Sequence, residues 1–118
     1  MINQYEMPSY VHDSIPELDN ELEALGKTNP YSVMRTLLDF TSRKAKEQNL
    51  PLVKKSFEIA DKLYTRGNNI IRNAVENVYV YSLEKVLHTS GIDSARILAI
   101  IPMTLYTLYI KQACHRGY

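Results

Sequence analysis

The sequence has no tryptophan, two phenylalanines and one cysteine in 118 residues. The single cysteine, Cys114, excludes a disulfide within the chain, and a chain of this length buries enough surface to fold without one. The longest uncharged run, residues 97–110, is fourteen residues long, whereas a membrane-spanning helix needs about 20 apolar residues. We therefore expect a domain that folds around its own hydrophobic core and does not span a membrane.

Residues 1–10 lack the positive cluster and the apolar stretch of an export signal. The lone cysteine gives no sign of an oxidising compartment either, so the pattern favours a cytoplasmic protein. The length and the composition, with 45% hydrophobic and 23% charged residues, fit one domain over residues 1–118.

Glycine and proline are also scarce, with four and five residues, and most of them stand at the ends of apolar-periodic runs. Such runs end before Gly26, Gly67 and Gly91 and begin at Pro16, Pro30 and Pro51. Glycine after a helix commonly supplies a positive φ, and proline is well accepted in the first helical turn. Only Pro102 interrupts a run, and its missing N–H predicts a kink or a break there.

These boundaries predict an all-α fold: a compact single-domain bundle of about five helices, with the last helix kinked or broken at Pro102. The expected helices cover residues 15–25, 30–45, 51–66 and 69–87, and a last one begins near Asp93. Ser14 and Glu17 form a capping box at the start of the first helix. Residues 1–13 precede that helix and are a candidate flexible acidic arm.

Apolar spacing also predicts which helix faces are buried. The buried face of the 30–45 helix carries Met34, Leu37, Leu38, Thr41 and Ala45. The 69–87 helix is apolar over most of its circumference, which predicts a central position with Val75, Val78 and Leu83 in the core. Residues 78–81 also fit a strand, but the helical spacing around them and the lack of a partner strand favour a helix.

The net charge is only +1, but the charges are distributed unevenly along the chain. Residues 1–26 carry six acidic residues and no lysine or arginine, while the remainder carries seven acidic and fourteen basic residues. We expect the acidic segment to dock as a helix on the basic body through Leu18, Leu22 and Leu25.

A basic cluster surrounds the turn between the 30–45 and 51–66 helices. It consists of Arg43, Lys44, Lys46, Lys54 and Lys55. Such a cluster can contact phosphate, but it has no interleaved aromatic residues, and the near-neutral net charge argues against a nucleic-acid-binding protein. The favoured interpretation is a solvated turn that receives the acidic segment. Arg43, Lys44 and Lys54 remain a second candidate binding surface.

Recognisable catalytic and metal-binding patterns are missing. The three histidines, His12, His88 and His115, are far apart in the sequence. Glu84 and His88 share a helix face, but no further ligand pair accompanies them, and a cation near a helix C-terminus explains the histidine without a metal. Cys114 and His115 are adjacent in a helix and point about 100° apart, so they are a poor thiol–base pair. We therefore expect no enzyme activity, no metal and no cofactor.

Nine tyrosines are the most unusual feature of the composition. Tyrosine is enriched in interfaces because its ring offers contact area and its hydroxyl group offers a hydrogen bond. Tyr106, Tyr109 and Gln112 follow one another at spacing three along one side of the last helix, near the carbonyl group that Pro102 frees. This combination predicts a recognition face, and packing of the same residues in the core is the alternative.

The run KSFEIADKLYTRGNNIIRNAVENVYVYSLEKVL, followed by IIPMTLYTLYIKQ, resembles a small all-helical family of uncharacterised bacterial proteins, a domain of unknown function. The features that carry the resemblance are the succession of Lys-Leu-Tyr, Gly-Asn, Glu-Asn and Val-Tyr-Ser and a Pro-x-x-Leu-Tyr ending, within residues 29–114. The resemblance implies a helical fold and a bacterial origin, and it brings no activity and no functional residues.

Taken together, these observations favour a non-enzymatic helical protein-interaction module whose partner is another protein. A homo-oligomer is also open, whereas nucleic acid and membrane are not expected as partners. Two alternatives remain. One is an immunity or antitoxin-like inhibitor of a partner protein, and the other is a small-molecule binder or enzyme with a pocket near the Pro102 kink.

Overall fold

Asparagine and proline residues mark helix starts in the computed structural model, which describes residues 2–3, 5–15, 30–89 and 94–115. The elements are α1 (Met7–Ser14), α3 (Pro30–Lys46), α4 (Leu50–Arg66), α5 (Asn69–Ala74), the π-helix η2 (Val75–Val80), α6 (Leu83–Thr89), α7 (Ser94–Ile100) and α8 (Met103–His115). The Asn49 side chain accepts a hydrogen bond from the Leu52 N–H at 3.3 Å, and the Asn68 side chain accepts one from the Ile71 N–H at 3.1 Å. Both caps satisfy N–H groups that a first helical turn leaves without partners.

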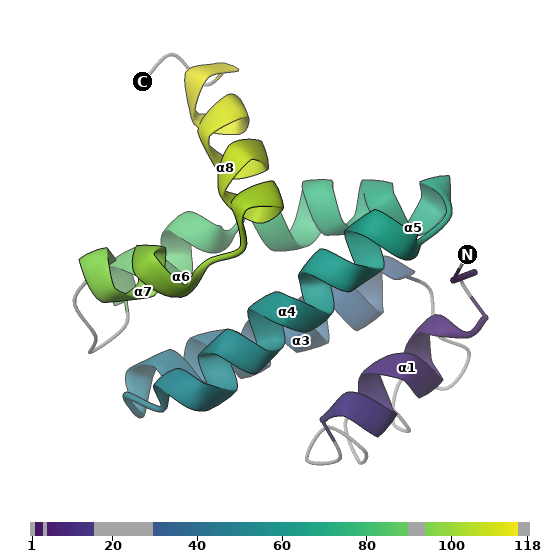
Figure 1. Cartoon of the computed structure of the whole chain (residues 1–118), viewed down its shortest axis with the longest axis horizontal. Helices are drawn as coiled ribbons and strands as arrows, with labels where there is room; N and C mark the ends of the chain where they lie inside the picture. The colour runs from purple at the N-terminus through teal and green to yellow at the C-terminus, as the bar shows by residue number, and fades with distance from the viewer. Residues whose placement is uncertain (1, 4, 16–29, 90–93, 116–118) are drawn as a thin grey trace.

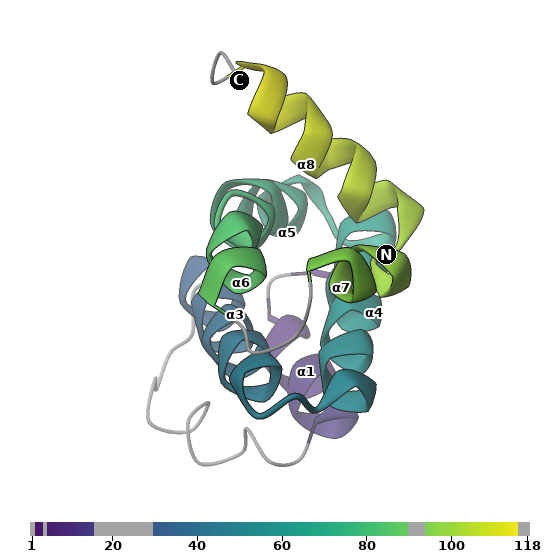
Figure 2. The same ribbon diagram turned by 90° about the vertical axis from the view of Figure 1, so that its left-hand side faces the viewer.

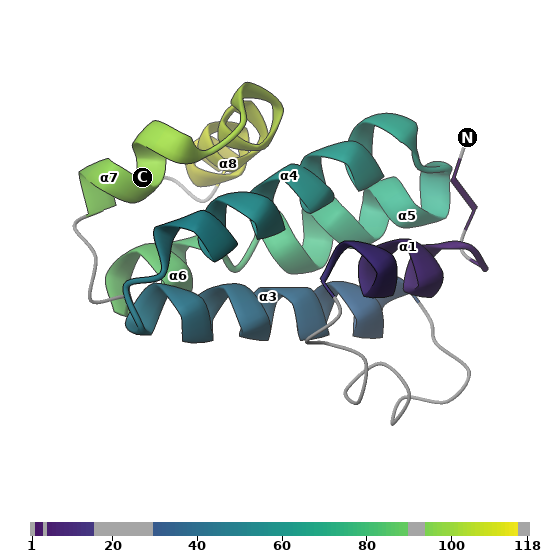
Figure 3. The ribbon, with the colours of Figure 1, turned by 60° about the horizontal axis from the view of Figure 1, so that its bottom comes forward.

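Helices account for the regular structure of the described ranges, where the single β-type pairing is an isolated bridge between Ile2 and Gly67. The predicted all-α single domain is thus confirmed, and residues 78–81 are helical rather than a strand. Figure 3 shows α3 and α4 side by side, and α1 packs against both. Helix α3 also contacts α5, η2 and α6, and all five residues of its predicted apolar face are buried. The centre of the fold therefore lies on α3 as well as on the 69–87 run.

Tyr79 is the largest of the fully buried side chains described, and it joins three elements of the core. Its hydroxyl oxygen lies 2.9 Å from Thr41 Oγ1 on α3, and Thr41 Oγ1 donates a hydrogen bond to the Leu37 carbonyl oxygen at 2.8 Å. Thr41 has a single hydroxyl hydrogen and donates it to Leu37, so Tyr79 is the donor in the hydrogen bond between the two hydroxyl groups. The Tyr79 ring meets the Phe57 ring of α4 edge to face, with centroids 6.5 Å apart. Burial raises the pKa of Tyr79, and the hydrogen bond with Thr41 only partly opposes that rise, so the hydroxyl stays neutral.

The predicted 69–87 helix is one helical run whose middle widens into the π-helix η2. Val75 and Leu83 are buried in the core as predicted. Val78 is not: it is only partly buried and packs against the edge of the core. A π-helix has more residues per turn than the 3.6 of an α-helix. The side that faces the core therefore shifts across this segment, relative to the face predicted from the α-helical period.

The predicted break at Pro102 is confirmed, because α7 ends at Ile100 and α8 begins at Met103. The carbonyl oxygen of Pro102 accepts a hydrogen bond from the Tyr106 N–H at 3.0 Å and so opens the new helix. Figures 1 and 2 show α8 leaving the body at this point and projecting beyond the other helices. It contacts α4 and η2.

Gly67 does end α4, but its predicted positive φ is wrong. Its φ is −78°, in the extended region, and the positive φ among the described non-glycine residues belongs to Gln48, at 60°, in the turn after α3. Gly67 is explained by space: a Cβ atom there would meet the Leu63 carbonyl oxygen and the Ile71 side chain, whose Cγ2 would be 2.6 Å away. Gly26 and Gly91 lie outside the described residues.

The N-terminal residues differ from the expected arm. Residues 7–14 form α1, and Met7, Val11 and Ile15, spaced by four, are all buried in the core. The backbone of Ile2 is also held, since its N–H donates to the Arg66 carbonyl oxygen at 2.7 Å and its carbonyl oxygen accepts from the Asn68 N–H at 2.9 Å. Ile15 ends α1, while the rest of the expected 15–25 helix, with Leu18, Leu22 and Leu25, lies outside the described residues.

The Thr41–Tyr79 contact predicts an asymmetric double-mutant cycle. Thr41→Val leaves the Tyr79 hydroxyl buried without its partner, which lowers the free energy of unfolding by about 1–3 kcal/mol. Tyr79→Phe removes donor and hydroxyl together and costs about 1 kcal/mol. In urea denaturation, the double variant should lose less than the sum of the two single losses. Additive losses would contradict a direct bond between the two hydroxyl groups.

The difference in burial between Val75 and Val78 gives a second prediction. Val75→Asp places an ionisable group in the core, so the variant should lose the cooperative thermal transition. Val78→Asp, at a partly buried position, should retain it with a lower melting temperature. Circular dichroism during heating measures both. Loss of the transition in both variants would mean that Val78 is as buried as Val75.

Candidate functional site

The sequence predicts no metal site, and the structure describes only some of the side chains that could form one. Among the described residues, no three His, Cys, Asp or Glu side chains gather as a metal ion requires. Glu84 is partly buried on α6, while the side chain of its expected partner, His88, is not among those described, nor are those of His12 and His115. Cys114 is a free, exposed cysteine on α8.

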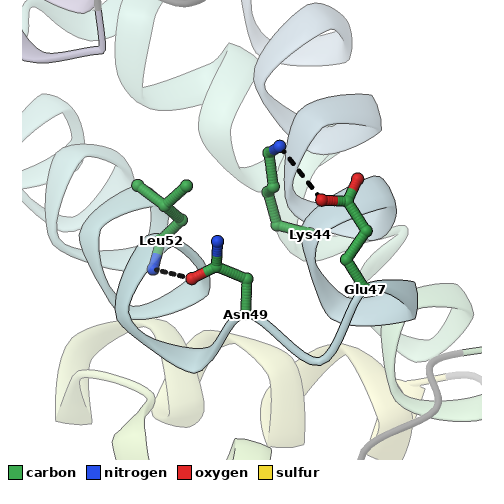
Figure 4. Close-up of polar contacts among 4 residues, drawn as sticks. All are labelled: Lys44, Glu47, Asn49 and Leu52. Carbon is green, nitrogen blue, oxygen red and sulfur yellow. Dashed lines mark hydrogen bonds and ion pairs between the residues drawn. The ribbon is translucent and has the colours of Figure 1, made fainter.

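The basic cluster surrounds the turn between α3 and α4, where Figure 4 shows Lys44 paired with Glu47. Lys44 Nζ lies 3.2 Å from Glu47 Oε1 in an ion pair across the turn. The Arg43 guanidinium and the Lys44 ammonium both lie over the Phe40 ring, 5.9 and 5.4 Å from its centroid. Phe40 is itself buried, so its ring offers no free face on which a nucleic-acid base could stack.

The position of these bases in α3 explains them without a ligand. Arg43, Lys44 and Lys46 occupy the last turn of α3, where positive charge is favoured by the helix dipole. Lys54 and Lys55 are exposed on the other side of the turn, in the first turns of α4. The structure therefore brings Arg43, Lys44 and Lys54 to one turn, and neither of the two depressions described below is lined by any of the three.

The predicted recognition residues on α8 do not share one face. Tyr106 is 38% exposed, whereas Tyr109 and Gln112 are partly buried toward the body. The geometry of the α-helix is the reason: each step of three residues turns the side chain by about 60°, so Tyr106 and Gln112 point about 120° apart. Tyr109 packs against the core cluster. Of the three candidate residues, Tyr106 is the exposed one.

Gln112 attaches α8 to the π-helix. Its side-chain N–H donates to the Glu76 carbonyl oxygen at 2.8 Å, and the same oxygen accepts the Tyr81 N–H at 3.2 Å. Tyr64 on α4 donates from its hydroxyl group to Glu76 Oε1 at 3.1 Å. Glu76 thus connects η2 to α4 through its side chain and to α8 through its backbone.

Arg72 supports the same junction from α5. Its guanidinium lies 4.8 Å from the centroid of the Tyr64 ring, and one guanidinium nitrogen lies 3.5 Å from the Tyr64 hydroxyl group. The hydrogen bond to Tyr64 raises the pKa of Arg72 further above its usual high value. Arg72 is therefore a permanent cation that holds the Tyr64 ring in position for Glu76.

The outward face of α8 carries large apolar side chains. Met103 is 76% exposed, Ile110 is 40% exposed, and Tyr106 lies between them at the helical spacing of three and four residues. Thr107 and Cys114 are exposed along the same stripe. We call Met103, Tyr106, Thr107, Ile110 and Cys114 the outer stripe. The opposite side of α8 carries Leu105, which is fully buried, and the partly buried Leu108 and Gln112.

Periodicity alone did not distinguish the two sides of α8, because apolar residues occur on both of them. The outer stripe has the spacing of an amphipathic face, but so has the inner one. Only the contact with η2 and α4 shows which side the body covers. The signal that was available in the sequence is that α8 has apolar residues on two opposite sides: a helix that packs on a small domain by one side leaves the other exposed.

Two depressions lie between α1 and α4. One, of about 540 Å³, is lined by Ile2, Glu6, Tyr10, Thr65 and Arg66. The other, of about 200 Å³, lies on the far side of Tyr10 and includes Asp13, Ser14, Lys55 and Lys62 in its lining. Burial raises the pKa of Tyr10, and the nearby positive charge of Arg66 opposes this rise. Neither depression is lined by Pro102 or by residues of α7 or α8, so neither is the pocket expected at the Pro102 break.

The fold and the candidate site define an all-α domain in which a C-terminal helix is fixed by one face and projects from the body. The chain belongs to a family described as a domain of unknown function (DUF7674), whose family model matches residues 8–117. The match extends through α8 and also reaches into α1, which lies before the start of the resemblance seen in the sequence. No curated protein and no solved structure matches the chain. None of the helices in the described part of the chain combines the length and hydrophobicity of a membrane span.

The attachment of α8 through Gln112 is testable by hydrogen exchange. Gln112→Ala removes the side-chain donor, while the Glu76 carbonyl oxygen keeps the Tyr81 N–H as its partner. A loss of about 1 kcal/mol should speed exchange of the α8 amides roughly fivefold. Thr107→Ala, on the outer stripe of the same helix, is the control and should leave exchange nearly unchanged. Equal effects of the two variants would contradict docking through Gln112.

Proposed function

We propose that this chain is a non-enzymatic protein-binding module and that the outer stripe of α8 contacts its partner. The observation that carries the proposal is the exposure of Met103, Tyr106 and Ile110 on one face of a helix whose other face is packed on the body. Methionine and aromatic residues are enriched in protein interfaces, and exposed apolar side chains grouped on one face commonly mark an interaction site.

The attachment of α8 supports this role. A binding helix must hold its apolar side chains in fixed positions, because ordering them on contact costs conformational entropy. Here Leu105 is fully buried and Gln112 is hydrogen-bonded to η2, so the inner face sets the direction of the outer stripe before any partner arrives. The break at Pro102 adds to this effect because it allows α8 to leave the direction of α7.

The proposed location is the cytoplasm. The exposed thiol of Cys114 lies within the proposed binding face, and a reducing compartment keeps such a thiol free. An accessible lone cysteine in an oxidising compartment would be open to pairing between chains.

Two matched isoleucines test the proposal. Ile110→Lys places a charge in the outer stripe, while Ile70→Lys places the same charge at a position of similar exposure, 44% against 40%, on α5. We expect affinity purification from the native cells, with quantitative mass spectrometry, to yield a protein that binds the wild-type chain and Ile70→Lys but is lost with Ile110→Lys. Purified together, that protein and the wild-type chain should form a complex that Ile110→Lys weakens at least tenfold.

Both variants should keep the helical circular dichroism and the melting temperature of the wild type, because neither position is in the core. The proposal fails if every captured protein is retained by Ile110→Lys, or if Ile70→Lys loses the same protein to the same extent.

A further inference from the structure

The charged residues within α7 and α8 are all of one sign. The last acidic residue of the sequence is Asp93, and the 25 residues that follow it contain three bases, Arg96, Lys111 and Arg116, and no aspartate or glutamate. Arg96 on α7 and Lys111 on α8 are both exposed. On the helix, Lys111 lies beside Thr107, at the border of the outer stripe. This surface is thus an apolar stripe with positive charge at its border.

From this surface we infer the class of partner, an inference that rests on the proposed function: the outer stripe binds an amphipathic helix whose apolar side chains are flanked by acidic residues. The stripe extends from Met103 to Cys114, which is about 17 Å or three helical turns. An apolar face on one helix packs against a similar face on another helix, whose apolar residues also recur every three and four positions. Acidic flanks on that second helix are opposite in sign to Lys111 at the border of the outer stripe.

A second copy of this chain is a poorer occupant. Two copies of α8 would bring only bases to the borders of the contact, because the chain has no acidic residue after Asp93. The outer stripe also has five residues, whereas a standard stable interface uses about 20–30 residues on each side. The contact is therefore suited to a short helical segment bound reversibly.

A lipid surface is also a poorer occupant. Helices that lie on membranes carry many lysines and arginines on their polar face. In α8, Lys111 is the single lysine or arginine, and the side opposite the outer stripe is packed against η2 and α4. One border charge is enough to select an acidic partner helix but gives little attraction to an anionic bilayer.

A displayed library of helical peptides tests the inference with the full chain. Each peptide has a fixed apolar stripe of leucine, and the flanking positions vary among glutamate, lysine, glutamine and alanine. Peptides are selected on the immobilised wild-type chain and counter-selected on Ile110→Lys, so that only binding through the outer stripe is enriched. We expect glutamate to be enriched over lysine at the flanks, and purified glutamate-flanked peptides to bind roughly fivefold more tightly than lysine-flanked ones in low salt.

Lys111→Glu is the variant that reverses the border charge, and Lys85→Glu, an exposed lysine on α6, is the matched control. Lys111→Glu should abolish or invert the preference for glutamate, while Lys85→Glu should retain it. The preference should also shrink as salt rises toward 1 M. Sedimentation with phosphatidylserine vesicles is the lipid arm, and the wild-type chain should remain in the supernatant.

Each other outcome overturns the inference. These outcomes are enrichment of lysine or of no particular flank, the absence of any peptide that depends on Ile110, and vesicle binding that Ile110→Lys abolishes. The capture experiment with Ile110→Lys and Ile70→Lys distinguishes a failure of the proposed function from a failure of the inferred partner class. If a native partner is lost only with Ile110→Lys while the selected peptides show no acidic preference, the protein-binding function stands and the partner class is wrong.

Discussion

The hydroxyl group of Tyr79 must have a hydrogen-bond partner inside the core, and much of the packing depends on this need. Tyr79 is fully buried, and its hydroxyl group donates a hydrogen bond to Thr41 on α3. An unpaired hydroxyl group at this depth would cost about 1–3 kcal/mol, a large part of the stability of a small domain. The edge-to-face contact with Phe57 adds α4 to the same point. One polar group and one ring thus connect α3, α4 and η2 at a single point of the core.

The π-helix lets one short segment meet two demands. Tyr79 must point into the core, while Glu76, three residues earlier, contacts α4 with its carboxylate and α8 with its carbonyl oxygen. The i to i+5 hydrogen bond from Tyr81 to Glu76 widens the turn between these positions. A π-segment is rare and less favourable than the α-helix it replaces, and such segments are frequent at functional sites. Here it joins the core contact of Tyr79 to the attachment of the projecting helix.

The attachment of α8 by one side is what makes its other side available. Leu105 and Gln112 use the inner side for the body, and the outer stripe keeps its apolar side chains in contact with solvent. The same junction that stabilises the fold thus orients the proposed binding face. A small domain can carry a binding function on one helix, since a few fixed apolar side chains supply most of the energy of many protein contacts.

Local signals in the sequence determined where helices begin and end. Asn49, Pro51 and Pro102 act within four residues, through a cap, a preset φ or a missing donor, so their effects do not depend on the rest of the chain. The apolar face of α3 was likewise readable, because a regular α-helix keeps its period. The all-α fold follows from these signals together.

Only the tertiary structure decided the features that depend on contacts between distant residues. The partial burial of Val78, for example, comes from the π-turn packed on α3. The candidate site shows the same division: the sequence made Tyr106 a candidate recognition residue, but Met103 and Ile110 became candidates only once the body was seen to cover the other side of α8. A helix with apolar residues on two opposite sides does not show by itself which side is left exposed, because the neighbouring helices make that choice.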